Sequence, residues 1–194
     1  MSRYRGPKLK IIRRLGPLPA LTTKSSKKIN PPGQHGKQTN KPSSYAIRLL
    51  EKQKLKYNYG ITEKKLYSYI KQARRTRQST TLVLLQLLEM RLDNILYRAG
   101  VTPTINAARQ IINHAHIFVN HKKMSIPSYQ CQIHDIITYK LKNTYYKFIK
   151  TPNIPSFLKV DEIQNCLIIK QKISRSQLLL EVDELLIIEY YSKN

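Results

Sequence analysis

The stretch TINAARQIINHAHIFVNHKKM, residues 104–124, decides the fold class because the spacing of its apolar residues changes part of the way along. Apolar residues recur at helical spacing after Thr104, which can cap a helix. Residues 117–119 then read as a strand, and residues 120–124 read as a turn and a return strand. A helix followed by a β-hairpin places the chain in the α+β class.

Helices are predicted before this stretch and mainly strands after it. Helical spacing, in most cases behind a capping Ser or Thr, predicts helices over residues 44–56, 62–75, 82–90 and 92–100. Short apolar runs predict strands at residues 136–139 and 166–172. Residues 183–191 read as a final helix capped by Asp183, although residues 185–191 could also form a strand.

These elements predict a chain of four segments. Residues 1–43 hold six of the ten prolines and little apolar periodicity, so we expect an extended basic arm that becomes ordered on its partner. Residues 44–89 form a helical body, and residues 90–152 form a small α/β module inserted in the chain. Residues 153–177 are a linker and a strand. Residues 178–194 complete the body, with the C-terminal helix packed back on it.

The tail is suited to this packing because it is both apolar and acidic, which makes it a poor ligand for a polyanion. Leu185, Leu186, Ile188 and Tyr191 need an apolar partner, and the body offers one.

Net charge points to a polyanionic partner. The chain carries 35 Lys and Arg against 11 Asp and Glu, a net charge of +24. The first 50 residues contain no acidic residue, and most of the excess charge lies in residues 1–78. The charge extends over many segments, and no apolar run approaches the roughly 20 residues of a membrane-spanning helix. Nucleic acid is therefore favoured over a membrane surface.

Metal, cofactor and catalytic chemistry have little support in the sequence. Cys131 and Cys166 lack the spacing of a metal site, and His114 and His116 have no third ligand. No catalytic constellation is found on either side of the module. We therefore expect no zinc, no cofactor, no small-molecule substrate and no enzymatic activity.

Several strings carry a resemblance to a known family. They are MSRYRGP (1–7), IIRRLG (11–16), PPGQHG (31–36), EKQKL (51–55), LLQLLEMRLDN (84–94), AARQ (107–110) and ELLIIEYYS (184–192). Taken together and in order, they resemble ribosomal protein S4 of the small subunit, in its plastid form. The inserted module then resembles the S4-type RNA-binding module.

The resemblance implies a structural constituent of the small ribosomal subunit. Such a protein binds small-subunit rRNA directly at a multi-helix junction, nucleates assembly of the body and contributes to decoding accuracy. Implied partners are ribosomal protein S5, other small-subunit proteins and messenger RNA near its entrance channel. Localisation would be the plastid, and the start MSRYRGPK has no apolar signal region, so we expect the protein to work where it is made.

Cations, hydrogen-bonding side chains and one helix cap make up the expected RNA-binding set. It consists of Arg3, Arg5, Arg13, Arg14, Gln34, His35, Arg48, Lys52, Lys54, Arg74, Arg75, Arg77, Arg91, Arg98, Thr104, Arg109 and His114. Arg109 is expected to be exposed. Asp93 is expected to orient Arg91 or Arg98 rather than to contact RNA.

Some positions depart from the family pattern. Ala115 stands where the family usually has Arg, and His121 replaces the Gly of an Asn-Gly turn, which makes a positive φ less favourable there.

Two other functions stay open. The chain could be a free RNA-binding repressor or chaperone, or an RNA-modifying enzyme that uses the same module.

Overall fold

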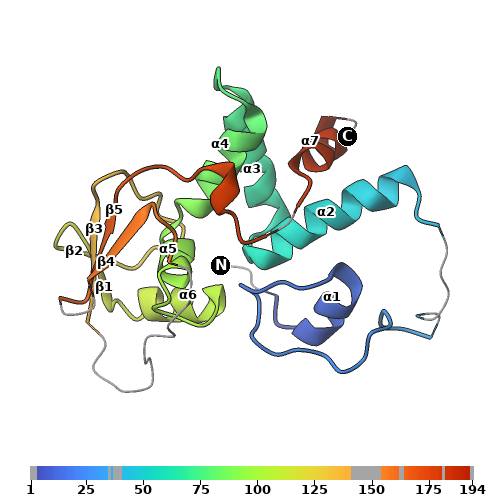
Figure 1. Cartoon of the computed structure of the whole chain (residues 1–194), viewed down its shortest axis with the longest axis horizontal. Coiled ribbons are helices and arrows are strands. Elements are labelled where there is room, and N and C mark those ends of the chain that lie inside the picture. The colour runs from blue at the N-terminus through green and yellow to red at the C-terminus, as the bar shows by residue number, and fades with distance from the viewer. Residues whose placement is uncertain are drawn as a thin grey trace. The chain divides into compact units, whose positions relative to one another are not determined.

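The structure is a computed structural model that divides into two compact units (Figure 1). It describes residues 4–34, 36, 41–140, 154–161, 164–180 and 182–192. Residues 1–81 and 179–194 form the first unit, and residues 82–178 form the second. The second unit is thus an insertion in the chain. The division falls within α4 (Thr80–Glu89), earlier than the predicted module boundary at residue 90.

Two central helices of the first unit begin where their capping residues predict. Helix α2 is Ser44–Asn58, and the Ser43 hydroxyl accepts a hydrogen bond from the Ala46 amide at 3.2 Å. Helix α3 is Glu63–Arg74, and Thr62 caps it in the same way. Each cap satisfies an amide that has no partner within its helix.

The N-terminal segment differs from the extended arm that was expected. It contains helix α1 (Lys8–Leu15), and the side chains of Leu15, Leu18 and Leu21 are buried. These side chains form a small cluster with one another, and Leu50 and Tyr57 of α2 and Leu180 pack against it. The segment therefore gains part of its apolar core from residues distant in sequence, which the local pattern does not show.

The tail folds back on the body as predicted. Helix α7 (Glu184–Ser192) packs on α2, and Arg48 donates to Glu189 at 2.8 Å. The strand alternative is wrong, because Ile187 and Tyr191 lie on one buried helical face. Leu185, which was expected to need a partner, is instead 64% exposed.

The second unit combines helices with an antiparallel sheet. Besides most of α4, its helices are α5 (Leu92–Arg98), α6 (Ile105–Asn113) and the short 3₁₀ helix η2 (Arg175–Gln177). Its strands are β1 (Ile117–Val119), β2 (Lys122–Met124), β3 (Ile136–Tyr139), β4 (Leu158–Asp161) and β5 (Cys166–Ile169). Their order in the sheet is β2-β1-β3-β5-β4. The α+β class is confirmed.

Strands β4 and β5 change the reading of residues 153–177. This segment was predicted to be a linker and a strand, but β4 pairs with β5, and β5 pairs with β3. The predicted strand at 166–172 is present over a shorter range. Strand β4 was missed because four residues beside Pro155 are too few to show a clear alternation.

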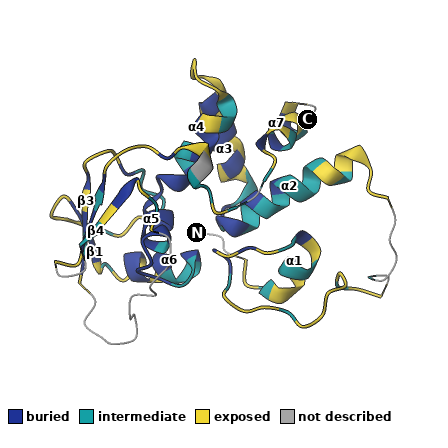
Figure 2. Ribbon diagram, in the orientation of Figure 1, coloured by how far each residue is buried: buried dark blue, intermediate teal, exposed yellow. Residues whose placement is uncertain are grey.

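A continuous apolar core joins α5 and α6 to the sheet. Ile95, Ile112, Ile117 and Leu167 are all fully buried in it. Figure 2 shows the consequence, since α5 and α6 are largely buried whereas α1 and the loop that follows it are mostly half-buried or exposed. Among the described residues, no helix is both long and apolar enough to span a bilayer.

Candidate nucleic-acid interface

Arg91 and Arg109 are held inside the second unit by one carboxylate. Arg91 donates to Asp93 through Nε at 2.9 Å and through Nη2 at 2.7 Å, and Arg109 Nε lies 2.7 Å from Asp93 Oδ2. All three side chains are nearly inaccessible to solvent. The expected exposure of Arg109 is therefore wrong. Arg109 follows Ile105 by four positions and so shares its inward face of α6.

Arg98 is buried in a second polar cluster. Its Nε lies 3.4 Å from Glu89 Oε2, and its guanidinium donates to the Gln177 carbonyl. Asn94 donates to the same Glu89 oxygen at 2.6 Å. These contacts, together with the Gln130 amide bonded to the Leu87 carbonyl, tie the end of α4 to the module. They explain why the unit begins before residue 90.

Asp93 acts as the orienting group that was expected. It pairs with Arg91, as predicted, but its second partner is Arg109 rather than Arg98. The structure thus assigns a packing role to three arginines from the predicted RNA-binding set. Their direct contact with RNA stays an untested prediction, and the geometry gives it no support.

Exposed polar residues of the second unit lie, among other places, at the end of α6 and along the hairpin. His114 ends α6, and its ring lies 6.2 Å from that of His116. Thr104 caps the start of α6 by accepting from the Ala107 amide at 3.3 Å. The predicted set omitted several exposed basic residues of this unit, among them Lys122, Lys123 and Lys140. The pair of lysines directly after the turn was the available signal.

The hairpin turn has the backbone conformation expected of an Asn-Gly sequence. Asn120 has φ of 48° and His121 has φ of 65°, so the replacement of glycine places a residue with a Cβ in the left-handed region. The Asn120 side chain donates to Asp135 at 2.8 Å and accepts from the Ile136 amide at 2.9 Å. These bonds fix the turn against β3. Ala115 also has a positive φ, of 60°.

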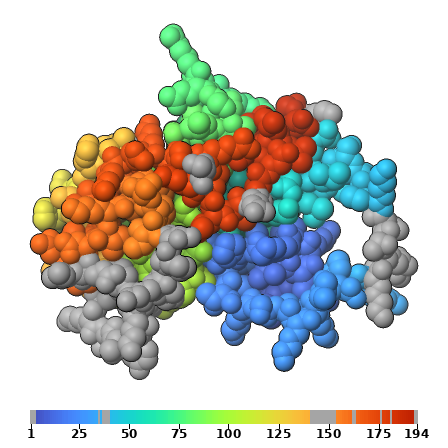
Figure 3. Space-filling view, in the orientation of Figure 1, coloured from blue at the N-terminus to red at the C-terminus, as the bar shows by residue number. Residues whose placement is uncertain are grey.

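In the first unit, the end of α3 presents an exposed cluster of cations. Arg74, Arg75 and Arg77 are all exposed, and residues 75–79 project as a narrow tip (Figure 3). In the part of the chain that the structure describes, none of the three forms an ion pair. Cations at a helix C-terminus also suit the helix dipole, yet their exposure leaves them able to meet phosphate.

Helix α1 and the loop after it form a second basic surface. Arg5, Arg14 and Gln34 are exposed, whereas Arg3 and His35 lie outside the described residues. Arg13 instead donates to the carbonyl of Asn30 at 2.8 Å and to that of Pro31 at 3.3 Å. The predicted set omitted the exposed Lys24, Lys27 and Lys28, although the absence of acidic residues from this region was a visible signal.

The predicted cations of α2 are engaged within the body. Besides Arg48, Lys54 pairs with Glu51 at 2.6 Å. Lys52 is buried, lies 2.9 Å from Glu63 and sits over the Tyr190 ring at 4.6 Å.

Glu63 is the acceptor that links α2, α3 and α7. Burial acts to raise its pKa, but hydrogen bonds from Tyr191 and Lys52 outweigh burial, so its pKa lies below the ordinary value. Lys52 therefore holds helices together in the free protein.

The described part of the chain contains two cysteines and scattered potential metal ligands. No group of three or more potential metal ligands occurs among these residues. Cys131 and Cys166 are free and buried, and burial raises the pKa of the Cys131 thiol, which makes it a poor nucleophile.

The fold and its exposed basic surfaces are those of a nucleic-acid-binding protein. Residues 3–89 match the model for the ribosomal protein S4/S9 N-terminal domain, and residues 90–137 match the S4 domain. The chain is 54% identical to small ribosomal subunit protein uS4c of Rhodomonas salina, over 100% of this chain and 99% of that protein. It is 53% identical to uS4c of Cyanophora paradoxa over the whole of both chains. It is 51% identical to uS4 of Trichodesmium erythraeum, over 100% of this chain and 99% of that protein.

The chain therefore belongs to the ribosomal protein S4 family. Both the resemblance drawn from the sequence and its plastid character are confirmed, since uS4c proteins are among the most similar relatives. Membership in this family makes the chain a structural, rRNA-binding protein of the ribosome rather than an enzyme.

Proposed function

We propose that this chain is built into the small subunit of the plastid ribosome, where it binds the rRNA directly through exposed cations of both units. One observation carries the proposal. Most ion pairs of the described acidic residues involve cations that are buried or lie on helices of the body, as those of Asp93 and Glu63 do. Arg75, Lys24 and Lys28 form no ion pair with a carboxylate among the described residues. Their charge is left for a polyanion.

The mode of binding follows from the geometry of RNA. A-form helices hide their base edges in a deep groove, so proteins recognise folded RNA mainly through phosphates, 2′-hydroxyls and unpaired bases. Separate basic surfaces on α1, on the end of α3 and on the β1–β2 hairpin suit a target that offers phosphates from several helices. This supports binding at a multi-helix junction, and with it a role in nucleating assembly of the subunit body.

The proposed protein partners rest on the family. Relatives are named as small ribosomal subunit proteins, so neighbouring subunit proteins are expected contacts. Ribosomal protein S5 is the proposed partner through which the chain contributes to decoding accuracy. Proximity to messenger RNA at its entrance channel belongs to the same proposal.

Co-sedimentation tests the function directly. A tagged full-length chain should migrate with small subunits when a plastid extract is centrifuged through a sucrose gradient, and it should stay bound to the subunit after the two subunits are separated. A variant with Arg74, Arg75 and Arg77 changed to Gln should show weaker incorporation, because the three side chains are exposed and not part of the core. Recovery of the unaltered chain only in the free fraction would favour a repressor or chaperone instead.

A further inference from the structure

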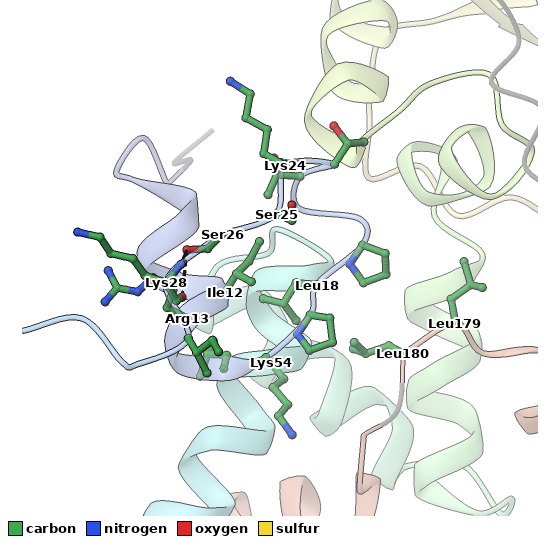
Figure 4. Close-up of a pocket in the computed structure, with 17 residues that line it drawn as sticks. Ile12, Arg13, Leu18, Lys24, Ser25, Ser26, Lys28, Lys54, Leu179 and Leu180 are labelled. Carbon is green, nitrogen blue, oxygen red and sulfur yellow. Dashed lines mark hydrogen bonds between the residues drawn. The ribbon is translucent and has the colours of Figure 1, made fainter. Parts of the chain in front are cut away.

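A cavity of about 840 Å³ lies within the first unit, between α1, the loop that follows it and the segment that leads into α7. Its walls are apolar at the centre and basic at the edge. Figure 4 shows Ile12 and Leu18 toward the middle, while Lys24, Lys28 and Lys54 extend outward from the rim. The cavity therefore has an apolar floor, with Arg13, Lys24, Lys28 and Lys54 among its lining residues.

Charge restricts what this cavity can hold. Every charged residue that lines it is basic, and no carboxylate is among the lining residues. Lys54 pairs with Glu51, and Arg13 is bonded to the Asn30 and Pro31 carbonyls, whereas Lys24 and Lys28 form no ion pair with any described residue. A lysine has four rotatable side-chain bonds, so both ammonium groups can turn toward a ligand. The ligand should be an anion.

Ile29 indicates an apolar part in the same ligand. It lines the cavity, yet it is 92% exposed. The hydroxyls of Ser25 and Thr22 also line the cavity and can bond to a sugar. Apolar contact, hydroxyl contact and cations together match the base, the ribose and the phosphate of a nucleotide.

We propose that the cavity receives one unstacked nucleotide of the bound rRNA. Its base lies against Ile29 and Ile12, and its flanking phosphates meet Lys24 and Lys28. Arg13 is a positioning residue that keeps the loop closed over α1. Proteins commonly read RNA by taking unpaired bases out of the stack, and the volume suits a ligand of this size. This inference rests on the proposed function, because it needs a bound rRNA.

Site-specific cross-linking tests where the nucleotide lies. A full-length chain carrying photoreactive benzoylphenylalanine in place of Ile29 would be bound to small-subunit rRNA and irradiated, with the same group at exposed Ile126 as the control. The cross-link from position 29 should map to a single unpaired nucleotide that position 126 does not reach. Cross-links spread over paired RNA would overturn the inference. If the unaltered chain fails to bind rRNA at all, the proposed function fails instead.

A double-mutant cycle tests the contact itself. Ile29→Ser and an abasic substitution at the mapped nucleotide should each weaken binding about 5- to 20-fold, and the two together should weaken it no further than one alone. If the two changes together weaken binding by the product of their separate effects, the inference is overturned.

Lys28→Gln should weaken binding several-fold, whereas the same change at Lys159, an exposed lysine on β4, should not. Because Ile29 and Lys28 are exposed, melting temperatures should stay at the unaltered value, which separates lost contacts from lost folding.

Discussion

The exposed basic surfaces of the first unit and the α5–α6 pair of the second unit use basic residues in opposite ways. Lys24, Lys28 and Arg75 stand in solvent without a described carboxylate partner. Arg91 and Arg109 are buried on Asp93. The number of cations in a sequence therefore overstates the charge that is available to bind RNA. A basic residue in an RNA-binding module can be a core residue.

The cost of burial explains why the buried arginines need their carboxylate. An isolated charge loses its hydration in the interior, and only close pairing with good hydrogen bonds offsets this loss. Removing one partner leaves an uncompensated charge, which costs more than the pair itself contributes. The two regions should therefore respond differently to the loss of charge.

Loss of the Asp93 carboxylate should destabilise the protein more than any other change considered. Asp93→Asn removes the charge that Arg91 and Arg109 share, so the free energy of unfolding of the second unit should fall by about 3–5 kcal/mol. Urea denaturation followed by circular dichroism measures it. The control is Asp183→Asn, because Asp183 is an exposed cap of α7 and Asn caps helices equally well. A loss below about 1 kcal/mol for Asp93→Asn would show that the buried network is not structural.

A matched pair of arginines separates packing from binding. Arg109→Ala should reduce stability by about 2–3 kcal/mol, because it removes one of two cations on Asp93 and leaves a cavity. Arg75→Ala should leave stability unchanged and weaken rRNA binding by about 1–3 kcal/mol. Thermal unfolding and filter binding on both variants provide the measurement. If instead Arg109→Ala weakens rRNA binding and leaves stability unchanged, while Arg75→Ala lowers stability and leaves binding unchanged, then Arg109 contacts the RNA and Arg75 does not.

Much of the fold could be predicted because local rules and global packing agree. The caps at Ser43, Thr62 and Thr104 mark helix starts, and the change of spacing after Asn113 marks the hairpin. Helix α1 and strand β4 could not be predicted in this way. Both are short, and helix α1 packs against residues that are distant in sequence, whereas β4 is an edge strand that, among the described strands, pairs only with β5.

The candidate site was less predictable than the fold. The excess of basic residues identified the exposed cations at the end of α3 and on α1 and the loop after it. It could not show that Arg75 is exposed and Arg109 is buried. That distinction depends on which face of α6 turns inward and on a carboxylate at residue 93. The lysines of the loop were overlooked because no motif contains them, although Lys24 and Lys28 line the cavity.

A smaller effect is expected at the hairpin of the second unit. His121→Gly should raise stability by about 1 kcal/mol, because glycine adopts a φ of 65° without the strain of a Cβ. Differential scanning calorimetry should show a higher melting temperature. His116→Gly serves as the control, since His116 has no positive φ and should lose stability through the added backbone freedom. An equal loss in both variants would show that the turn is not strained.

The smallest effect is expected in acid. The pKa of Glu63 lies below its ordinary value of 4.5, so its bonds stabilise the first unit fully above pH 4.5 and are lost as the pH falls through the lower, folded pKa. Glu63→Gln should therefore be less stable near neutral pH and should lose less stability below pH 4.5. Melting temperatures between pH 6 and 3 test this. Parallel curves for the variant and the unaltered chain would contradict the assigned role of Glu63.

We propose that exposed cations bind the rRNA while the buried arginines hold the fold. The salt dependence of rRNA affinity tests it most directly, because each phosphate contact releases counterions. The unaltered chain should give a log–log slope of about −5 to −10, and the triple variant Lys24→Gln, Lys28→Gln, Arg75→Gln should be less steep by about 2–3. A nearly flat slope, or one that the triple variant leaves unchanged, would contradict the account.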